Sequence, residues 1–383
     1  MKIAILTLPL HTNYGGILQA YALQTVLERM GHQVVVLDLY TFYRVLPLWK
    51  KPFSYTKRFF EKYLFKKIDV INIEKHINLI LPIIRQHTQQ FIDQYIHYDS
   101  VDRYSSIKEK RYDAIIVGSD QVWRPSYFRK NIKQAYLYFA KDWNIRRIAY
   151  APSFGTDYWE YSDEQTAICA DLLAKFDAVS VREESALGLV REKLGRDAVW
   201  VLDPTMLLTK DDYIRLFQSK TIPSGKGNLM VYVLDWSKTV DAYIKKLETT
   251  YSFSSFITNS IYVEKLDSIC SHSCSCSLED YIQPPVENWL QGFDKAELVV
   301  TDSFHACVFS LLFNKPFIVL RNSTRGNTRI DSLLGLFNQK HRIVDDISRI
   351  QLTDAQLAKP NVLEKIDYLK TLSLNFIDNA LKE

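Results

Sequence analysis

The sequence of 383 residues lacks several features that would place it in a specialised class of protein. No apolar run reaches the roughly 18 residues of a membrane span, and the apolar start Lys2–Leu10 ends at His11 without a small-residue cleavage pattern. The five cysteines, three of them crowded between residues 270 and 276, do not make the even framework of a small secreted domain. We therefore expect a protein of the reducing cytoplasm.

The sequence also lacks a strong overall charge: 48 basic and 44 acidic residues give +4, too weak a field to indicate nucleic acid as a partner. The charge is unevenly distributed along the sequence. The segment from Arg44 to Lys67 contains eight basic residues and a single acidic one, Glu61, so its net charge is +7 and that of the rest of the chain is −3. Aromatic residues are interleaved with these charges, namely Trp49, Phe53, Tyr55, Phe59, Phe60, Tyr63 and Phe65. Such a segment is typical of a helix on an anionic membrane surface. A solvated helix whose aromatic side chains pack on a sheet is the alternative.

The sequence does contain, again and again, a short apolar run that ends in polar or small residues. We predict strands at residues 3–8, 33–39, 113–117, 147–150, 178–181, 198–202, 229–234, 255–258, 298–301 and 316–320. Between the first two, apolar residues recur at helical spacing up to Gly31, which makes a βαβ unit and implies parallel sheets. The turn-rich segment 221–227 favours a boundary near residues 204–225. We expect two α/β domains facing across a cleft, residues 1–210 and 211–360, followed by a terminal helix in 361–383.

Ligands of open α/β sheets bind beyond the carboxyl ends of the strands, so the residues that follow the predicted strands are the candidate site. The glycine fingerprint of dinucleotide-binding proteins is missing. Instead, residues 13–16 (NYGG) open a helix, where free backbone N–H groups could face an anion or a sugar hydroxyl, although an ordinary tight turn fits equally well. Residues 118–123 (GSDQVW) follow a strand, and Asp120, Gln121 and Trp123 suit a carbohydrate. The alternative is that Asp120 caps a helix and Trp123 fills the core.

Cationic residues follow two strands of the second half. His305 comes just after the strand at 298–301 and the capping residue Ser303, a position that favours catalysis over a structural role. Arg321, Arg325 and Arg329 recur every four residues and form a candidate anion site. No glutamate occurs between residues 298 and 363, which argues against a ribose held by a glutamate there and favours a small anionic donor.

One cluster of ligand-type residues does not have the spacing of a metal site. Cys270, His272, Cys274 and Cys276 alternate, so on a strand they would lie about 6.6 Å apart per step, too far for one tetrahedral ion. We favour a strand or loop over a metal site and assign no metal.

Six segments together resemble the polysaccharide pyruvyl transferase family. They are residues 13–24 (NYGGILQAYALQ), 118–123 (GSDQVW), 150–155 (YAPSFG), 180–183 (SVRE), 202–204 (LDP) and 301–305 (TDSFH). The resemblance extends from about residue 3 to 345. Ala306 stands where the family commonly has glycine, and Pro152 stands where a small residue is usual.

The resemblance implies a fold like that of the two-domain B-type glycosyltransferases and transfer of pyruvate from phosphoenolpyruvate onto two sugar hydroxyls as a cyclic ketal, in surface polysaccharide biosynthesis. No cofactor is implied. The first domain would bind the acceptor, which we expect to be a polyprenyl-linked sugar, and the second would bind the donor. By the resemblance, Arg182 and His305 occupy the family's active-site arginine and histidine positions, and Ser303 stands where some relatives carry another arginine. The chemistry of ketal formation favours His305 as acid and Arg182 as cationic clamp, with Asp120 either as the base or as a grip on an acceptor hydroxyl; these three are the catalytic candidates. The donor-binding candidates are Ser303, Arg325 and Arg329. The implied acceptor-binding residues are Asn13, Tyr14, Gly15, Gly16, Gln19, Ser119, Gln121, Trp123 and Ser153. A nucleotide-sugar glycosyltransferase and a non-catalytic glycan-binding subunit are the alternatives.

Overall fold

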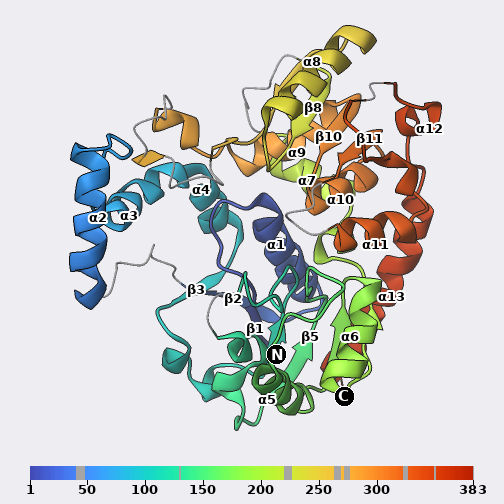
Figure 1. Cartoon of the computed structure of the whole chain (residues 1–383). Helices are drawn as coiled ribbons and strands as arrows, with labels where there is room; N and C mark the ends of the chain where they lie inside the picture. Colours follow the sequence, from blue (N-terminus) through green and yellow to red (C-terminus); the bar gives the residue numbers. More distant parts are fainter. Residues whose placement is uncertain are drawn as a thin grey trace.

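The computed structural model describes residues 1–39, 48–128, 131–219, 227–262, 269–270, 277–321, 327–348 and 351–382. These residues form two parallel sheets, one in each half of the chain, with helices packed around them (Figure 1). The predicted α/β class with two Rossmann-like halves is therefore confirmed.

The N-terminal sheet has seven parallel strands in the order β3-β2-β1-β4-β5-β6-β7. Its strands are β1 (Lys2–Leu6), β2 (Gln33–Leu39), β3 (Tyr98–Val101), β4 (Ala114–Val117), β5 (Arg146–Ala149), β6 (Ala178–Val181) and β7 (Val199–Trp200). The helices of this half are α1 (Tyr14–Arg29), α2 (Lys51–Tyr63), α3 (Ile73–Ile84), α4 (Gln86–Tyr95), α5 (Asp163–Leu173), α6 (Glu184–Leu194) and α7 (Lys210–Phe217).

The C-terminal sheet has five parallel strands in the order β12-β11-β10-β8-β9. Its strands are β8 (Leu229–Tyr232), β9 (Ser255–Ile257), β10 (Leu298–Thr301), β11 (Phe317–Leu320) and β12 (Ile343–Val344). The helices of this half are α8 (Lys238–Tyr251), α9 (Val286–Lys295), α10 (Phe304–Leu312), α11 (Thr328–Leu336), α12 (Asp354–Leu357) and α13 (Leu363–Lys382).

The central strands are the ones that apolar runs predict best. Every residue of β4, β8, β10 and β11 is buried, as expected of parallel strands covered by helices on each face. The apolar pattern does not predict β3, whose middle residues Asp99 and Ser100 are polar and which lies at the edge of its sheet.

Helix α1 connects the two halves. Its N-cap Asn13 accepts a hydrogen bond from the Gly16 backbone N–H at 3.2 Å, which satisfies one free donor of the first turn. The ring of Tyr14 packs against Tyr232 and Trp289 of the C-terminal half, with centroid distances of 6.1 and 5.6 Å. The two sheets therefore share one hydrophobic core on this side.

Helix α13 returns to the N-terminal half, so the two chain ends lie near each other at the end of that half (Figure 1). The Leu202 backbone N–H donates to Ser373 Oγ at 3.0 Å, and the Arg146 guanidinium donates to the Ala380 carbonyl at 3.0 Å. The chain thus crosses between the halves twice, which fixes how the strand ends of one sheet face those of the other.

Helix α2 projects from the side of the molecule (Figure 1) and contains no buried residue. The interpretation in which its aromatic side chains pack on a sheet is wrong, since Phe53 is 81% exposed. Among the described residues, no helix is long and apolar enough to cross a membrane.

Candidate active site

The candidate site lies where strands β4 to β7 end and helix α10 begins. Ser119 and Asp120 follow β4, Ser153 follows β5 and Arg182 follows β6. His305 is the second residue of α10. Parallel strands bring their carboxyl ends to one edge of the sheet, and the shared core brings α10 of the other half against that edge.

Arg182 is the centre of the site and is held by carboxylates. Its Nη1 donates to Asp203 Oδ2 at 2.6 Å and to Ser119 Oγ at 3.3 Å. Its Nη2 lies 3.5 Å from Asp120 Oδ1, and its Nε lies 4.0 Å from Glu183 Oε2. The side chain is only 2% exposed, so these interactions act in a weakly screened environment.

Asp203 links the two halves of the chain. Its Oδ2 accepts from Arg182 and from Ser119 Oγ, the latter at 3.1 Å, and lies 3.7 Å from His305 Nε2. Its Oδ1 accepts from the backbone N–H and the hydroxyl of Thr205 at 3.0 and 2.6 Å. One carboxylate therefore orients the arginine of the N-terminal half and faces the histidine of the C-terminal half.

These neighbours shift the ionisation of the pair. Burial alone would raise the pKa of Asp203, but His305 and Arg182 hold it well below its usual range. Burial would lower the pKa of Arg182, yet the neighbouring carboxylates, Asp203 foremost, raise it above its usual value. Asp203 and Arg182 are therefore a charged pair over the whole range in which the protein would work.

The imidazole of His305 is fixed by a glycine of the opposite half. A Cβ atom on Gly15 would lie 2.0 Å from His305 Nδ1, so no side chain fits at residue 15 while the ring keeps its place. The first turn of α1 thus forms one wall of the histidine pocket. This is the physical reason for the glycine in the NYGG segment, which the sequence analysis places among the acceptor-binding residues.

A second arginine joins the cluster from helix α11. Arg329 is 9% exposed, and burial together with the charge of Arg182 lowers its pKa to about 10. The two guanidinium groups lie over the ring of Phe304, at 4.3 Å for Arg182 and 5.8 Å for Arg329. Phe304 thereby holds two like charges close together in one buried site.

Glu183 organises the loop after β5. Its Oε1 accepts from Ser153 Oγ at 2.8 Å and from the Phe154 backbone N–H at 2.9 Å. Gly155 completes this turn with a φ of 75°, and a Cβ there would lie 2.2 Å from Gln121 Oε1. The predicted acceptor residues Ser153 and Gln121 are thus buried parts of the turn that supports the cluster.

The backbone on either side of this loop adopts strained dihedral angles. Asp120 has a φ of 69° and Ala151 a φ of 55°, in the left-handed region that costs a non-glycine residue of order 1–2 kcal/mol. Asp120 also pairs with Pro152 in an isolated parallel bridge. Strain of this kind concentrates at functional sites, which supports the choice of Asp120 as a site residue.

Three predicted acceptor contacts are corrected by the structure. Trp123 is fully buried, its ring lies 4.9 Å from that of Tyr136 at an angle of 7°, and its indole N–H donates to the Ala135 carbonyl at 3.4 Å. Tyr14 is fully buried, and its hydroxyl donates to the Pro284 carbonyl at 2.6 Å. Burial keeps the two rings from stacking on a sugar, and the core interpretation of Trp123 is the correct one.

Gln19 is the third correction. It is fully buried, and its Nε2 donates to Thr7 Oγ1 and to the Gly16 carbonyl, each at 2.9 Å. The amide therefore joins α1 to the end of β1. It supports the Gly16 backbone from within the fold instead of facing a ligand.

The remaining predicted residues divide into those inside and those outside the cluster. Ser119 belongs to it through Arg182 and Asp203, whereas Asn13 is exposed and caps α1. Ser303 is the buried N-cap residue of α10, and its backbone N–H donates to Thr301 Oγ1 at 3.0 Å. Arg321 is paired with Asp345 and Asp331 and so does not contribute a free charge to an anion site. Arg325 lies outside the described residues.

The cysteine cluster remains untested as a metal site. Cys270 is buried, and His272, Cys274 and Cys276 lie outside the described residues. Within the part of the chain that the structure describes, no group of three or more metal-ligating side chains occurs.

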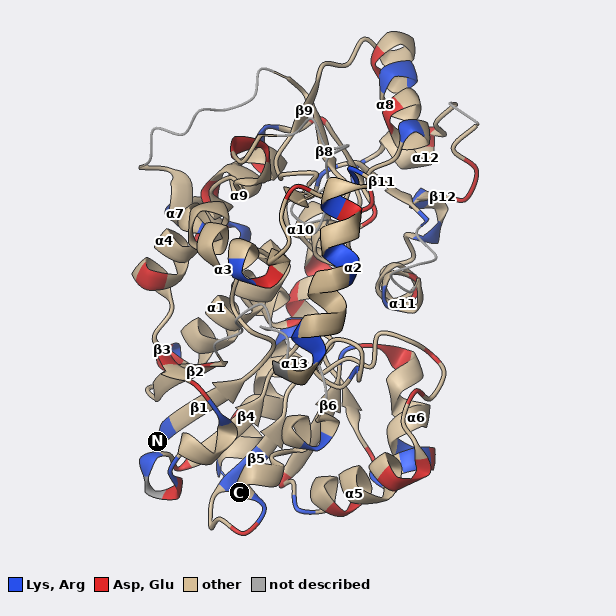
Figure 2. Ribbon diagram, turned by 60° about the vertical axis from the view of Figure 1, so that its left-hand side comes forward, with Lys and Arg blue, Asp and Glu red and all other residues tan. Residues whose placement is uncertain are grey.

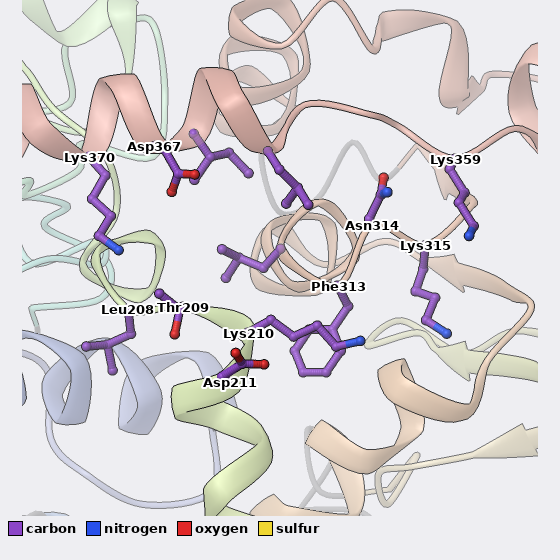
Figure 3. Close-up of a pocket in the computed structure, with 13 residues that line it drawn as sticks. Leu208, Thr209, Lys210, Asp211, Phe313, Asn314, Lys315, Lys359, Asp367 and Lys370 are labelled. Carbon is purple, nitrogen blue, oxygen red and sulfur yellow. The ribbon is translucent and has the colours of Figure 1, made fainter.

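A pocket of about 460 Å³ lies at the other end of α10, away from His305 (Figure 3). It is bordered by Phe313 at the end of α10, Lys210 at the start of α7 and Ile366 of α13. Its lining residues come from both halves of the chain and do not include His305, Arg182 or Asp203.

Asp203, Glu183 and Phe304 belong to the site although the sequence alone does not single them out. Each lies in a segment that carries the family resemblance. Each stands next to a residue that was singled out or directly after a predicted strand. For Asp203 and Glu183, the position beyond a strand end was the signal in the sequence that could have found them, because a buried acid there needs a cationic partner. Which partner it has depends on how the two sheets face each other.

Comparison with known proteins identifies a family and a fold. The family model for polysaccharide pyruvyl transferases matches residues 13–324. No curated protein matches the chain. Among solved structures, a UDP-N-acetylglucosamine 2-epimerase is similar with a TM-score of 0.50 at 12% identity, covering 97% of this chain and 90% of that one.

Two further structures align less closely. The UDP-GlcNAc 2-epimerase from Neisseria meningitidis has a TM-score of 0.47 at 11% identity and covers 100% of this chain and 99% of that one. MurG from Acinetobacter baumannii has a TM-score of 0.40 at 10% identity, covering 99% and 94%. At such identities the likeness concerns the fold alone. The two parallel sheets, together with the structure that has a TM-score of 0.50, confirm the predicted B-type glycosyltransferase fold.

Proposed function

Because the chain belongs to the polysaccharide pyruvyl transferase family, a family of transferases, we propose that it moves pyruvate from phosphoenolpyruvate onto two hydroxyls of a sugar as a cyclic ketal. The observation that carries this proposal is the buried cluster in which Asp203 joins Arg182 to His305. It supplies an acid and fixed cations in one water-poor site, which are the groups this reaction needs.

The reaction requires a proton at the methylene carbon of phosphoenolpyruvate, which becomes the methyl group of the ketal. The resulting oxocarbenium-like carbon is attacked by one sugar hydroxyl, phosphate then leaves, and a second hydroxyl closes the ring. Of the two hydroxyl protons released, one balances the proton added to carbon and the other leaves with phosphate. No oxidant, metal or cofactor enters this balance.

His305 is the proposed acid. Six buried ionisable side chains meet here, three carboxylates (Asp120, Glu183 and Asp203) and three bases (Arg182, Arg329 and His305). His305 Nε2 lies 3.7 Å from Asp203 Oδ2 among these groups, so one ring nitrogen is directed into the cluster where the donor is proposed to bind.

Arg182 and Arg329 are the proposed clamps for the donor. A bound phosphate and carboxylate would bring further negative charge beside two guanidinium groups that already lie close together over Phe304. Arg325 is proposed for the same role on its spacing alone, and Ser303 at the start of α10 is proposed as a further donor contact. Asp120 at the strained end of β4 is the proposed base toward the acceptor, with Asn13 and Gly16 as proposed contacts.

The test is transfer of labelled pyruvate from phosphoenolpyruvate to a panel of sugar acceptors that includes UDP-sugars and a polyprenyl-linked sugar. We expect label in the acceptor with release of one phosphate, and a loss of roughly 10²–10⁴ in turnover for His305→Gln. His341→Gln is the matched control, since His341 is exposed and outside the cluster. Release of UDP without phosphate would instead indicate a nucleotide-sugar glycosyltransferase, and full activity of folded His305→Gln would remove the acid role.

A further inference from the structure

Helix α2 has its apolar side turned outward. Phe53, Phe60 and Leu64 recur at positions i, i+7 and i+11, so they lie on one face of the helix. They are 81%, 49% and 69% exposed, and Trp49 just before the helix is 70% exposed. An outward aromatic stripe of this kind is an unpartnered surface, because a water-facing helix normally shows its polar side.

The opposite face of α2 fixes it to the rest of the molecule. Arg58 stands about half a turn away from the stripe and forms two hydrogen bonds with the Glu74 carboxylate of α3, each of 2.8 Å. It also donates to the Ile71 carbonyl at 3.2 Å. The orientation of the stripe is therefore set by a specific ion pair, and the aromatic side chains are held away from the body of the protein.

Basic residues share the segment with the stripe. Apart from Arg58, which pairs with Glu74, six lie between residues 48 and 67, namely Lys50, Lys51, Lys57, Lys62, Lys66 and Lys67, and Glu61 is the single acid there. Figure 2 shows basic residues along α2 on the side turned toward the viewer. On the neighbouring α3, Leu79 and Ile83 add apolar exposure of 66% and 42%. The surface thus combines large apolar side chains with a strong positive charge.

We propose that α2 is a peripheral docking helix for an anionic lipid bilayer. Its aromatic stripe would enter the level of the headgroups and its lysines would pair with lipid phosphates, the arrangement of an interfacial amphipathic helix. The positive charge argues against a second copy of this chain as the occupant, because two such helices would repel each other. The proposal concerns binding only and is independent of the reaction proposed above.

The test is co-sedimentation of the full chain with vesicles made of equal parts of phosphatidylglycerol and phosphatidylcholine, and with vesicles of phosphatidylcholine alone. We expect binding to the anionic vesicles in dilute salt. The variant Lys50→Glu/Lys57→Glu/Lys66→Glu should bind at least about a hundredfold more weakly, since each basic residue near such a surface contributes roughly a factor of five to ten. Arg58 is left unchanged because it anchors α2.

A matched variant separates this surface from overall charge. Lys238→Glu/Lys246→Glu/Lys365→Glu reverses three exposed lysines on α8 and α13 and changes the net charge equally, so it should bind as the wild type does. At about 1 M salt, charges are screened beyond about 3 Å, so the vesicle binding that the wild type retains there is due to its apolar side chains. The variant Phe53→Ser/Phe60→Ser has the same charge as the wild type and should lose most of this remaining binding.

Three results would overturn the proposal. The first is a wild type that does not sediment with anionic vesicles, and the second is equal weakening by the two triple variants. The third is a wild type that forms a dimer without lipid and is made monomeric by the α2 variant, which would assign the stripe to self-association.

Discussion

The replacement Asp203→Asn tests the link between the two halves of the candidate site. It keeps the size of the side chain but removes the charge that faces His305 Nε2 at 3.7 Å and binds Arg182 at 2.6 Å. Two unit charges at about 4 Å in a medium of effective dielectric 20 interact by about 4 kcal/mol. The dipole of the asparagine amide would retain part of this interaction energy. The loss of interaction with the His305 ring therefore lies between about 2 and 4 kcal/mol, which corresponds to a fall in turnover of about 30- to 1000-fold.

The assay is steady-state phosphate release from phosphoenolpyruvate with a saturating acceptor. Because Asp203 acts through His305, turnover should fall more than the donor KM rises. Glu74→Gln is the control, since it makes the same carboxylate-to-amide change in an arginine pair outside the site. A donor KM that rises while turnover is unchanged in folded Asp203→Asn, or an equal loss of turnover in Glu74→Gln, would refute a positioning role for Asp203.

Three further outcomes are expected. Gly15→Ala should favour helix formation by up to about 1 kcal/mol yet reduce turnover by tenfold or more, because its Cβ would displace His305, whereas Gly188→Ala, with no atom within 4 Å, should not change turnover. Trp123→Ala should lower the free energy of unfolding in urea by about 3–5 kcal/mol with little change in the acceptor KM of the folded fraction, and a selective rise in that KM would restore a sugar-stacking role. The pKa of Asp203 is depressed in the folded state, so its ionised carboxylate stabilises the fold fully above the unfolded pKa of about 3.9. This stabilisation is lost progressively as the pH falls below that value. The difference in unfolding free energy between wild type and Asp203→Asn, measured by urea titration, should therefore narrow below about pH 4, and a constant difference would contradict the charged pair.

The two ends of helix α10 lie in different surroundings. The first turn of α10 carries His305 into the charged cluster, while Phe313 at its other end borders the pocket with Lys315 nearby. Lys315 Nζ donates to the Asp294 carbonyl at 2.7 Å, and burial lowers its pKa. The pocket is also bordered by Leu208 and Thr209, which follow Asp203 by five and six residues.

The sequence by itself determined the fold class and most of the strands. Continuous apolar runs such as 114–117 and 298–301 can be buried on two faces only in a parallel sheet with helices around it, so their meaning does not depend on distant residues. The position of His305 just after such a run could likewise be predicted from neighbouring residues alone. The match of residues 13–324 to one family has the same origin, since its motifs are short and continuous.

Only the tertiary structure decided which of these residues meet. Asp203 and His305 are about a hundred residues apart in the chain, and they face each other because the shared core around Tyr14 and the returning α13 hold α10 against the strand ends of the N-terminal sheet. The same packing determined that Trp123 is buried while Phe53 is exposed, although each is an aromatic residue in a polar neighbourhood of the sequence. Burial of an aromatic side chain depends on what the rest of the chain places against it, and neither composition nor spacing contains that information.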